Sequence, residues 1–503
     1  MKKISAVTWL LFGLAILATY LVGLNFPFLG PDEARYAQVA REMFNRADVI
    51  TPTLGNHTWF EKPALLYWLQ MLGYKLFGIS ETAARIGSAV FGLLIISGLW
   101  FVGYNTARFS NSKFITPKDK FHFANWLALI AASSIGIIVF ARAASFDIIV
   151  TLPITVSLTS FYVHQIAPKN TLTYFVALVK FYLHMGLALL AKGLIGVLFP
   201  LSIVIVFFIV RRRIPNKYLR HSLGWGLLLT LLVAGIWYFP IYLVNGWQFV
   251  HEFFILHHFQ RFYSNKFLHP QPFWFFWVVL PLMTLPWTGF FIISAFRAFR
   301  DRVREFFANE SPDDSVSQLS TLAIIWVMLP LLFFSLSGSK LPGYILPAVP
   351  PAAILSALAV WKFIKHSRIR EFYLQLLAIA TFAVIAGLLA FVLPKFVVND
   401  TSKYLVQASN AEGYTTQRIA NYGDISHSLE FYGAGRLIRD NEGKQIRFDS
   451  IDDLKPYISD SDGLLVYLPP QYIRDFENNS SVRATVIDKN TEHAMILVEN
   501  IPK

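Results

Sequence analysis

Apolar runs long enough to cross a bilayer recur along most of this 503-residue chain. They constrain the fold more than any other feature, because a membrane-spanning helix needs about 20 consecutive, mainly apolar residues. The composition agrees, since 55% of the residues are hydrophobic and only 15% are charged. We therefore expect a mainly α-helical, polytopic transmembrane bundle with about 11 to 13 spans. The clearest runs lie at approximately residues 4–24, 82–104, 121–141, 144–163, 171–190, 193–210, 222–243, 273–296, 319–337, 344–361 and 373–394.

The basic residues of the loops predict how these spans are oriented. Lysine and arginine gather in alternate loops, at residues 2–3, 108–120, 211–220, 297–304 and 362–370. Because cytoplasmic loops are enriched in these residues, we assign this set to the cytoplasm. The net charge of +13 is then explained by membrane orientation, and a nucleic-acid partner is not expected. The remaining loops lie on the outer face of the membrane.

The composition changes after residue 394, where charged and polar residues return. Short apolar runs at residues 463–468 and 494–498 predict β-strands, with helical pieces between them. We expect two domains, a transmembrane domain over residues 1–394 and a small α/β domain on the outer face over residues 395–503. The chain has no cysteine, which excludes disulfides and thiolate metal sites.

A polar segment at residues 25–80 separates the first two predicted spans. Asp32 and Glu33 follow Pro31 at a predicted helix start, where the helix dipole favours negative charge. Ordinary helix capping explains such a pair equally well. A second charged pair, Glu61 and Lys62, lies in the same outer loop. The repetition of charged pairs on one face of the membrane makes this segment the first candidate for a functional site.

Other charged residues fall at the ends of predicted spans on the same face, among them Asp147, Lys192 and Lys340. Each alone is consistent with a snorkelling side chain or an ion pair at a helix end. Together they favour a site for a lipid-linked phosphate. Lysine can neutralise a phosphate that gains charge as its bond breaks, and a carboxylate can orient or deprotonate the attacking group. The competing class is a transporter, in which charges would lie at the bilayer midplane between related halves.

Several motifs within about residues 1–400 carry a more specific signal. They are PDEARYAQVAREM, FEKPALLYWLQ, LFGISETAARIGSAVFG, ARAASFD, LLAKGLIG, HHFQRF followed by HPQPFWFF, and SKLPGYILPAVP. In combination they resemble the bacterial membrane glycosyltransferases of the aminoarabinose lipid A transferase and protein mannosyltransferase type. The resemblance implies a GT-C fold with juxtamembrane helices in the first outer loop. It also implies an enzyme of the bacterial inner membrane whose active site faces the periplasm.

The reaction that this resemblance implies is an inverting sugar transfer. The donor would be a polyprenyl monophosphate sugar, such as an undecaprenyl phosphate carrying aminoarabinose. The acceptor would be lipid A or a related envelope molecule, and the alternative is a protein O-glycosyltransferase of the mannosyltransferase type. Asp32 and Asp147 match the acidic residues of the family. The residues expected at the donor phosphate are Arg35, Lys62, Lys192, Lys340 and Tyr344.

Two further sets of candidate residues concern the acceptor and a metal ion. Arg261, Lys266 and His269, in the predicted outer loop at residues 245–271, are candidates for binding acceptor phosphates. The aromatic residues of that loop are also typical of an interfacial loop anchored by its rings. Glu61 and His258 match positions that bind a divalent ion in the lipid A branch. Two ligands are too few to identify a metal from sequence.

Overall fold

We describe the chain from a computed structural model, which describes residues 6–260, 271–308, 312–459 and 462–501. The chain divides into two compact units. The first contains Met1–Val22, Phe60–Leu66 and Arg85–Ile385, and the second contains Gly23–Trp59, Tyr67–Ala84 and Ala386–Lys503. Most of the first outer loop therefore belongs to the same unit as the C-terminal part of the chain. The predicted domain boundary after residue 394 stays a prediction.

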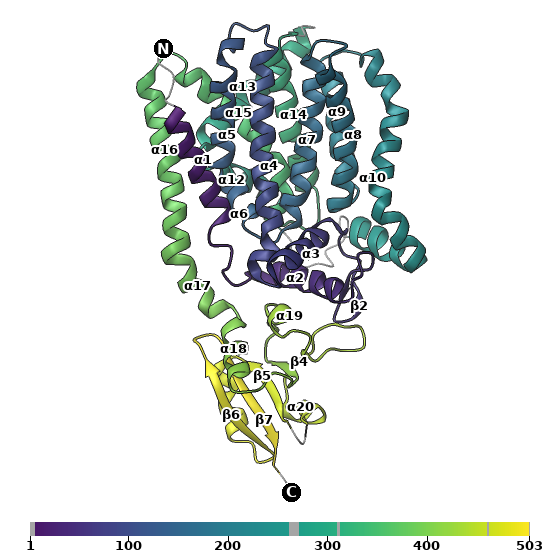
Figure 1. Ribbon diagram of the computed structural model, residues 1–503, viewed down its shortest axis with the longest axis vertical. Helices are drawn as coiled ribbons and strands as arrows, with labels where there is room; N and C mark the ends of the chain where they lie inside the picture. Colours follow the sequence, from purple (N-terminus) through teal and green to yellow (C-terminus); the bar gives the residue numbers. More distant parts are fainter. Residues whose placement is uncertain (1–5, 261–270, 309–311, 460–461, 502–503) are drawn as a thin grey trace. The chain divides into compact units, whose positions relative to one another are not determined.

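The described part of the first unit is helical, and Figure 1 shows its long helices as a bundle. Helices α4, α16 and α3 continue along the chain from one unit into the other. The elements are α1 (Ala6–Leu21), α4 (Glu81–Arg108), η1 (Pro117–Asp119), α5 (Lys120–Ala132), α6 (Ile135–Ala141), α7 (Phe146–Ile166), α8 (Leu172–Lys192), α9 (Ile195–Val210), α10 (Lys217–Val250), η2 (His251–Gln260), α12 (Phe275–Met283), α13 (Thr288–Ala308), α14 (Ser315–Ser335), η3 (Pro342–Ala348), α15 (Val349–Ile364) and α16 (Arg368–Gly387).

The predicted polytopic helical bundle is confirmed, although fewer helices pass as complete spans. Among the described residues, seven helices are long and apolar enough to cross a membrane, or eight if the bent pair α5 and α6 forms one span. Helix α9 has 16 residues, which corresponds to about 24 Å against a hydrocarbon core of about 30 Å. The predicted run at residues 273–296 is divided between α12 and α13.

Helix α7 is deeply buried in the bundle. In its most apolar window 89% of the residues are buried, compared with 11% in the span that begins with α16. Its threonines donate hydrogen bonds to carbonyls one turn earlier, from Thr151 to Asp147, from Thr155 to Thr151 and from Thr159 to Thr155, at 2.6–2.7 Å. Because these hydroxyls are satisfied within the helix, a central helix can carry them at little cost. This buried helix begins one residue before Asp147.

Helix α10 changes direction near its end. Gly246 has φ 54° and ψ −137° within the helical segment, a backbone conformation that glycine adopts more readily than other residues. The chain then continues into the π-helix η2. Beyond the bend, Phe249 and Phe253 stack with 5.3 Å between their ring centroids, and both contact Trp237 of the preceding segment. Aromatic side chains from both sides of the bend therefore pack together and stabilise it.

The second unit contains a five-stranded sheet in the order β4-β3-β5-β7-β6. Strands β3 and β5 are parallel, whereas β7 is antiparallel to both β5 and β6. The predicted strand runs at residues 463–468 and 494–498 correspond to β5 and β7, so the small α/β region is confirmed. The elements are α2 (Gly30–Asn45), β1 (Thr53–Leu54), β2 (His57–Thr58), α3 (Leu65–Phe77), η4 (Leu388–Val392), α17 (Leu393–Asp400), α18 (Lys403–Ala411), β3 (Ile419–Tyr422), α19 (Leu429–Tyr432), β4 (Arg447–Phe448), α20 (Ile451–Leu454), η5 (Lys455–Tyr457), β5 (Leu464–Leu468), η6 (Pro470–Tyr472), α21 (Ile473–Glu477), β6 (Val482–Lys489) and β7 (Ala494–Asn500).

Both faces of this sheet are covered. Alternate residues of β5 point to opposite sides, so that Leu464 and Val466 lie in one apolar cluster while Leu465 and Tyr467 lie in another. Strands buried on both faces become continuous apolar runs in the sequence. The apolar runs of β5 and β7 in the sequence have this cause.

Candidate active site

Asp147 stands at the amino end of α7, where the corner after α6 places it. Ser145 is the N-cap of this helix, and its hydroxyl accepts a hydrogen bond of 3.1 Å from the backbone N–H of Asp147. The Asp147 carboxylate forms an ion pair with the ammonium of Lys192, the last residue of α8. The two side chains are only 18% and 14% exposed, respectively. Each charge also has the sign that its helix end favours.

The turn before α15 closes over this ion pair. The Lys192 ammonium lies 4.9 Å from the ring centroid of Tyr344, a distance at which a cation is attracted to the face of the ring. A Cβ atom added to Gly343 would lie 1.8 Å from Oδ2 of Asp147, so that only glycine fits at this point of η3. Asp147, Lys192, Gly343 and Tyr344 are called the Asp147 cluster below. Three of these four residues were predicted from the sequence.

Lys340 lies in the same turn and has neutral partners. Its ammonium donates to the carbonyl oxygens of Ser337, at 2.6 Å, and Gln271, at 2.9 Å. The residue is 7% exposed. Carbonyl oxygens satisfy the hydrogen-bonding needs of an ammonium without cancelling its charge. The turn at residues 337–344 therefore presents a buried positive charge that is suited to an anionic group.

Glu61 and Lys62 form an ion pair with each other, at 2.9 Å between Oε1 and Nζ. The negative charge of Glu61 thus offsets part of the positive charge that the sequence assigned to a donor phosphate. Among the described residues there is no group of three or more His, Asp or Glu side chains placed to hold a metal ion. His258 lies in η2, but its side chain is outside the described part. The predicted metal ligands Glu61 and His258 therefore stay a prediction.

The three residues predicted to bind acceptor phosphates, Arg261, Lys266 and His269, lie outside the described residues. The segments on either side are η2, which ends at Gln260, and the chain from Gln271 that leads into α12. The acceptor assignment therefore stays a prediction.

The second unit carries the other predicted acidic residue. Asp32 lies in the first turn of α2, with Pro31 among its first residues, and its carboxylate is 3.7 Å from the Arg35 guanidinium. The Asp32 side chain is 51% exposed. Glu33 is buried at 8% exposure and accepts a hydrogen bond of 3.1 Å from the N–H of Leu29. The capping role therefore falls to Glu33, which leaves Asp32 facing outward.

Within this unit, the surroundings of Asp32 include groups from distant parts of the sequence. The Arg35 guanidinium lies 5.5 Å from the Trp59 ring. Burial of the His427 imidazole, together with the positive charge of Arg35, lowers the pKa of His427. The charges of Glu430 and Asp32 oppose this shift. His427 belongs to the loop before α19, and no motif in the sequence pointed to it.

The structure also separates scaffold residues from candidate site residues within one motif. In ARAASFD, Arg142 donates hydrogen bonds of 2.5 and 2.8 Å to the carbonyls of Thr19 and Val22. It therefore satisfies carbonyl groups at the carboxyl end of α1, as basic residues commonly do. Ser145 and Gly343 were not selected from the sequence, although both lie in motifs that were. Their roles depend on a cap and on a close approach, which a motif alone does not reveal.

Residues 10–257 match the family model described as dolichyl-phosphate-mannose-protein mannosyltransferase. A curated relative from Aeromonas salmonicida, named undecaprenyl phosphate-alpha-4-amino-4-deoxy-L-arabinose arabinosyl transferase, is 30% identical over 362 residues. The chain is therefore similar in sequence to membrane glycosyltransferases of the mannosyltransferase and arabinosyl transferase type. The match covers 71% of this chain and 61% of that relative, so the chain spans about three fifths of the length of the curated relatives it matches.

Solved structures confirm the GT-C fold. ArnT from Cupriavidus metallidurans, in a structure bound to undecaprenyl phosphate, superimposes with a TM-score of 0.74 at 22% identity, covering 98% of both chains. The archaeal oligosaccharyltransferase AglB from Archaeoglobus fulgidus matches with a TM-score of 0.55 at 12% identity, covering 93% of this chain and 69% of that one. Both comparisons concern the fold alone, which is similar despite the low sequence identity.

Proposed function

We propose that this protein is an inverting glycosyltransferase that moves a sugar, such as aminoarabinose, from undecaprenyl monophosphate to lipid A or a related envelope acceptor. Transfer would take place on the periplasmic face of the bacterial inner membrane. The observation that carries the proposal is the turn at residues 337–344. It holds the buried ammonium of Lys340 with neutral partners and packs Gly343 and Tyr344 against the ion pair of Asp147 and Lys192.

The donor phosphate gains negative charge in this reaction, and that charge must be stabilised. As the bond from the anomeric carbon to the phosphate oxygen breaks, its electron pair passes to the phosphate. Lys340 would meet that charge most directly, because its known partners are neutral. Lys62 and Lys192 already have carboxylate partners and would contribute less. The hydroxyl of Tyr344 would donate a hydrogen bond to the same phosphate. Arg35, in the second unit, stays a predicted donor-phosphate residue.

The acidic residues would have different roles. Asp147 is paired with Lys192 and lies against Gly343, so it would hold that lysine in place. Asp32 is half exposed and would meet the acceptor. With a hydroxyl acceptor, Asp32 would remove the proton as the oxygen attacks the opposite face of the sugar. With a phosphate acceptor the nucleophile is already an anion, and Asp32 would orient it or bind a cationic group such as an amino sugar.

The proposal can be tested with purified, full-length protein in liposomes that contain lipid A and an undecaprenyl phosphate aminoarabinose donor. We expect lipid A to gain the mass of one amino sugar. Lys340→Met should lower the rate at least tenfold, whereas Lys362→Met, at an exposed lysine of α15, should leave it unchanged. Equal rates for both variants would remove Lys340 from donor binding. Failure of any lipid acceptor to react would contradict the proposed reaction.

Protein O-glycosylation is the second candidate, because residues 10–257 match the protein mannosyltransferase model. Mass spectrometry of a strain that lacks this protein separates the two. Loss of an amino sugar from lipid A supports the first proposal. Unchanged lipid A together with loss of a glycan from envelope proteins supports the second.

A further inference from the structure

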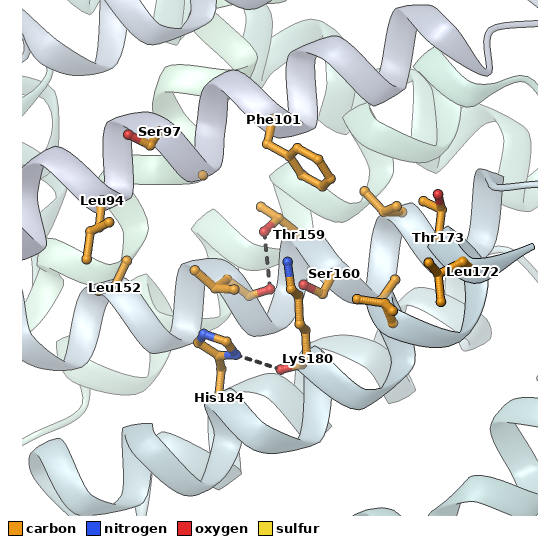
Figure 2. A pocket seen from close by; sticks show the side chains of 15 residues that line it. Leu94, Ser97, Phe101, Leu152, Thr159, Ser160, Leu172, Thr173, Lys180 and His184 are labelled. Carbon is orange, nitrogen blue, oxygen red and sulfur yellow. Dashed lines mark hydrogen bonds between the residues drawn. The ribbon is translucent and has the colours of Figure 1, made fainter.

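A groove lies between α4, α7 and α8 in the first unit, and Figure 2 shows it from close by. Its volume is about 470 Å³, within the range of small-molecule and cofactor sites. The walls are mainly apolar and include Leu94 and Phe101 from α4, Leu152 from α7 and Val176 from α8. The proposed transfer reaction assigns no role to this groove.

One cation interrupts the apolar lining. Lys180 is exposed, and in Figure 2 its side chain extends into the groove toward Ser160, with Thr159 nearby. Its ammonium lies 5.6 Å from the ring centroid of Phe101. The lining, as far as the structure describes it, contains no Asp or Glu. The groove therefore has a positive charge and no acidic residue to balance it, an expensive arrangement in a membrane unless an anion is present.

The position of Lys180 along α8 separates this groove from the Asp147 cluster. Lys180 is twelve residues before Lys192, or about 18 Å along a helix. Side chains of a helix lean toward its amino end, which for α8 is Leu172. Leu172 and Thr173 also line the groove. The groove thus extends from the middle of the helix toward the membrane face opposite the Asp147 cluster.

We propose that this groove binds one anionic glycerophospholipid from the leaflet on the Leu172 side. An acyl chain would lie along the apolar walls, and the headgroup phosphate would pair with Lys180. The charge of the groove favours an anionic lipid over a zwitterionic one. Its direction favours a lipid of that leaflet over the polyprenyl donor, whose proposed phosphate site is at the other end of α8. The bound lipid would join α4 to the two helices that carry Asp147 and Lys192.

Two substitutions test the two parts of this site separately. Lys180→Met removes the charge and keeps much of the length and apolar stem, and Lys180→Arg keeps the charge. Gly98 lines the groove, and a Cβ atom there would meet only Val156, at 3.9 Å. Gly98→Leu should therefore fill part of the groove without disturbing the bundle or Lys180. Lys169→Met, at an exposed lysine in the loop before α8, is the matched charge control.

The experiment uses native mass spectrometry of the full-length protein, released from nanodiscs that contain phosphatidylglycerol and phosphatidylcholine in equal amounts. Wild type, Lys169→Met and Lys180→Arg should retain one phosphatidylglycerol at least tenfold in excess over phosphatidylcholine. Lys180→Met should lose that preference, and Gly98→Leu should lose the bound lipid. The proposal is overturned if Lys180→Met keeps the preference, if Gly98→Leu retains the lipid as wild type does, or if undecaprenyl phosphate displaces the phosphatidylglycerol. If Lys180→Met does not fold, the result with Gly98→Leu decides.

Discussion

Asp147 and Asp32, the two predicted catalytic carboxylates, differ in burial and in how closely each is paired with a cation. In the first unit Asp147 is mostly buried and paired with Lys192, and the backbone at Gly343 leaves its carboxylate no room to move. In the second unit Asp32 is half exposed, and its carboxylate lies at the longer distance of 3.7 Å from the Arg35 guanidinium. A buried charge must have its partner built into the fold. A carboxylate that meets an incoming acceptor must remain accessible, so its position has to come from the helix that carries it.

That helix, α2, is fixed by residues from the C-terminal part of the same unit. Arg41 donates a hydrogen bond of 2.6 Å to the carbonyl of Phe431 and lies 4.4 Å from its ring. The hydroxyl of Tyr432 accepts a hydrogen bond from the N–H of Phe28, at 3.0 Å, and donates one to Glu81, at 2.9 Å. We infer that the C-terminal region supports the first outer loop, a role that its own sequence did not reveal.

The comparison predicts the largest effect at the buried pair. Lys192→Met should lower the free energy of unfolding by about 3–5 kcal/mol, because it leaves the Asp147 carboxylate buried without its cation. Thermal unfolding in detergent measures this loss. The double variant Asp147→Asn with Lys192→Met should regain part of it. If the two single effects simply add, the pair is not coupled and the contrast with Asp32 disappears.

At Asp32 the loss should be of activity and not of stability. Asp32→Asn should reduce transfer by about 100-fold or more, while the unfolding temperature stays within error of wild type because the side chain is half exposed. Rates in the liposome assay and thermal unfolding of the same sample measure both effects. Glu33→Gln is the matched control, and it should lower stability through the weakened cap at Leu29. Near-normal turnover of Asp32→Asn would remove this residue from the mechanism.

Substitution of Gly343, whose backbone lies against the Asp147 carboxylate, should have the next largest effect. Gly343→Ala should cost about 1–3 kcal/mol, since its Cβ atom must push Asp147 away from Lys192. We expect the transfer rate to fall along with stability. Gly289→Ala is the control, because a Cβ atom there meets nothing within 4 Å. Equal behaviour of the two variants would show that the turn does not hold Asp147.

A smaller effect is expected where the C-terminal region supports α2. Tyr432→Phe removes the hydroxyl that links Phe28 to Glu81 and should cost about 0.5–1.5 kcal/mol. If this contact positions Asp32, kcat should fall while the KM for the donor stays unchanged. Tyr472→Phe offers a comparison within the same unit, at a tyrosine that packs on Tyr422. A kcat that does not respond to Tyr432→Phe would separate the C-terminal region from catalysis.

The smallest effect should be a pH dependence at His427. Its pKa in the folded protein is below the ordinary value of 6.5, so the unfolded chain binds more protons as the pH falls past that value. Stability that depends on neutral His427 is therefore present above about pH 6.5 and declines below it. His427→Gln should flatten this decline in a series of unfolding measurements. An unchanged profile would show that burial and the charge of Arg35 do not lower the pKa of His427 in the folded protein.

Much of the fold was predictable because it depends on local composition. A run of about 20 apolar residues predicts a helix that can span a membrane wherever it lies, and the doubly covered strands β5 and β7 appeared as unbroken apolar runs. The number of complete spans was less predictable. Helix α9 is short, and the run at residues 273–296 is broken between α12 and α13, so the length of an apolar run did not equal the length of a helix.

The sequence by itself determined that the protein lies in a membrane, that its C-terminal part is α/β, and which charged residues deserve attention. Only the tertiary structure decided that Asp147 pairs with Lys192, that Glu33 caps α2 while Asp32 faces outward, and that most of the first outer loop belongs to one unit with residues 386–503. The physical reason is that hydropathy acts through nearby residues, whereas ion pairs, close backbone approaches and shared cores join residues that are tens to hundreds of positions apart.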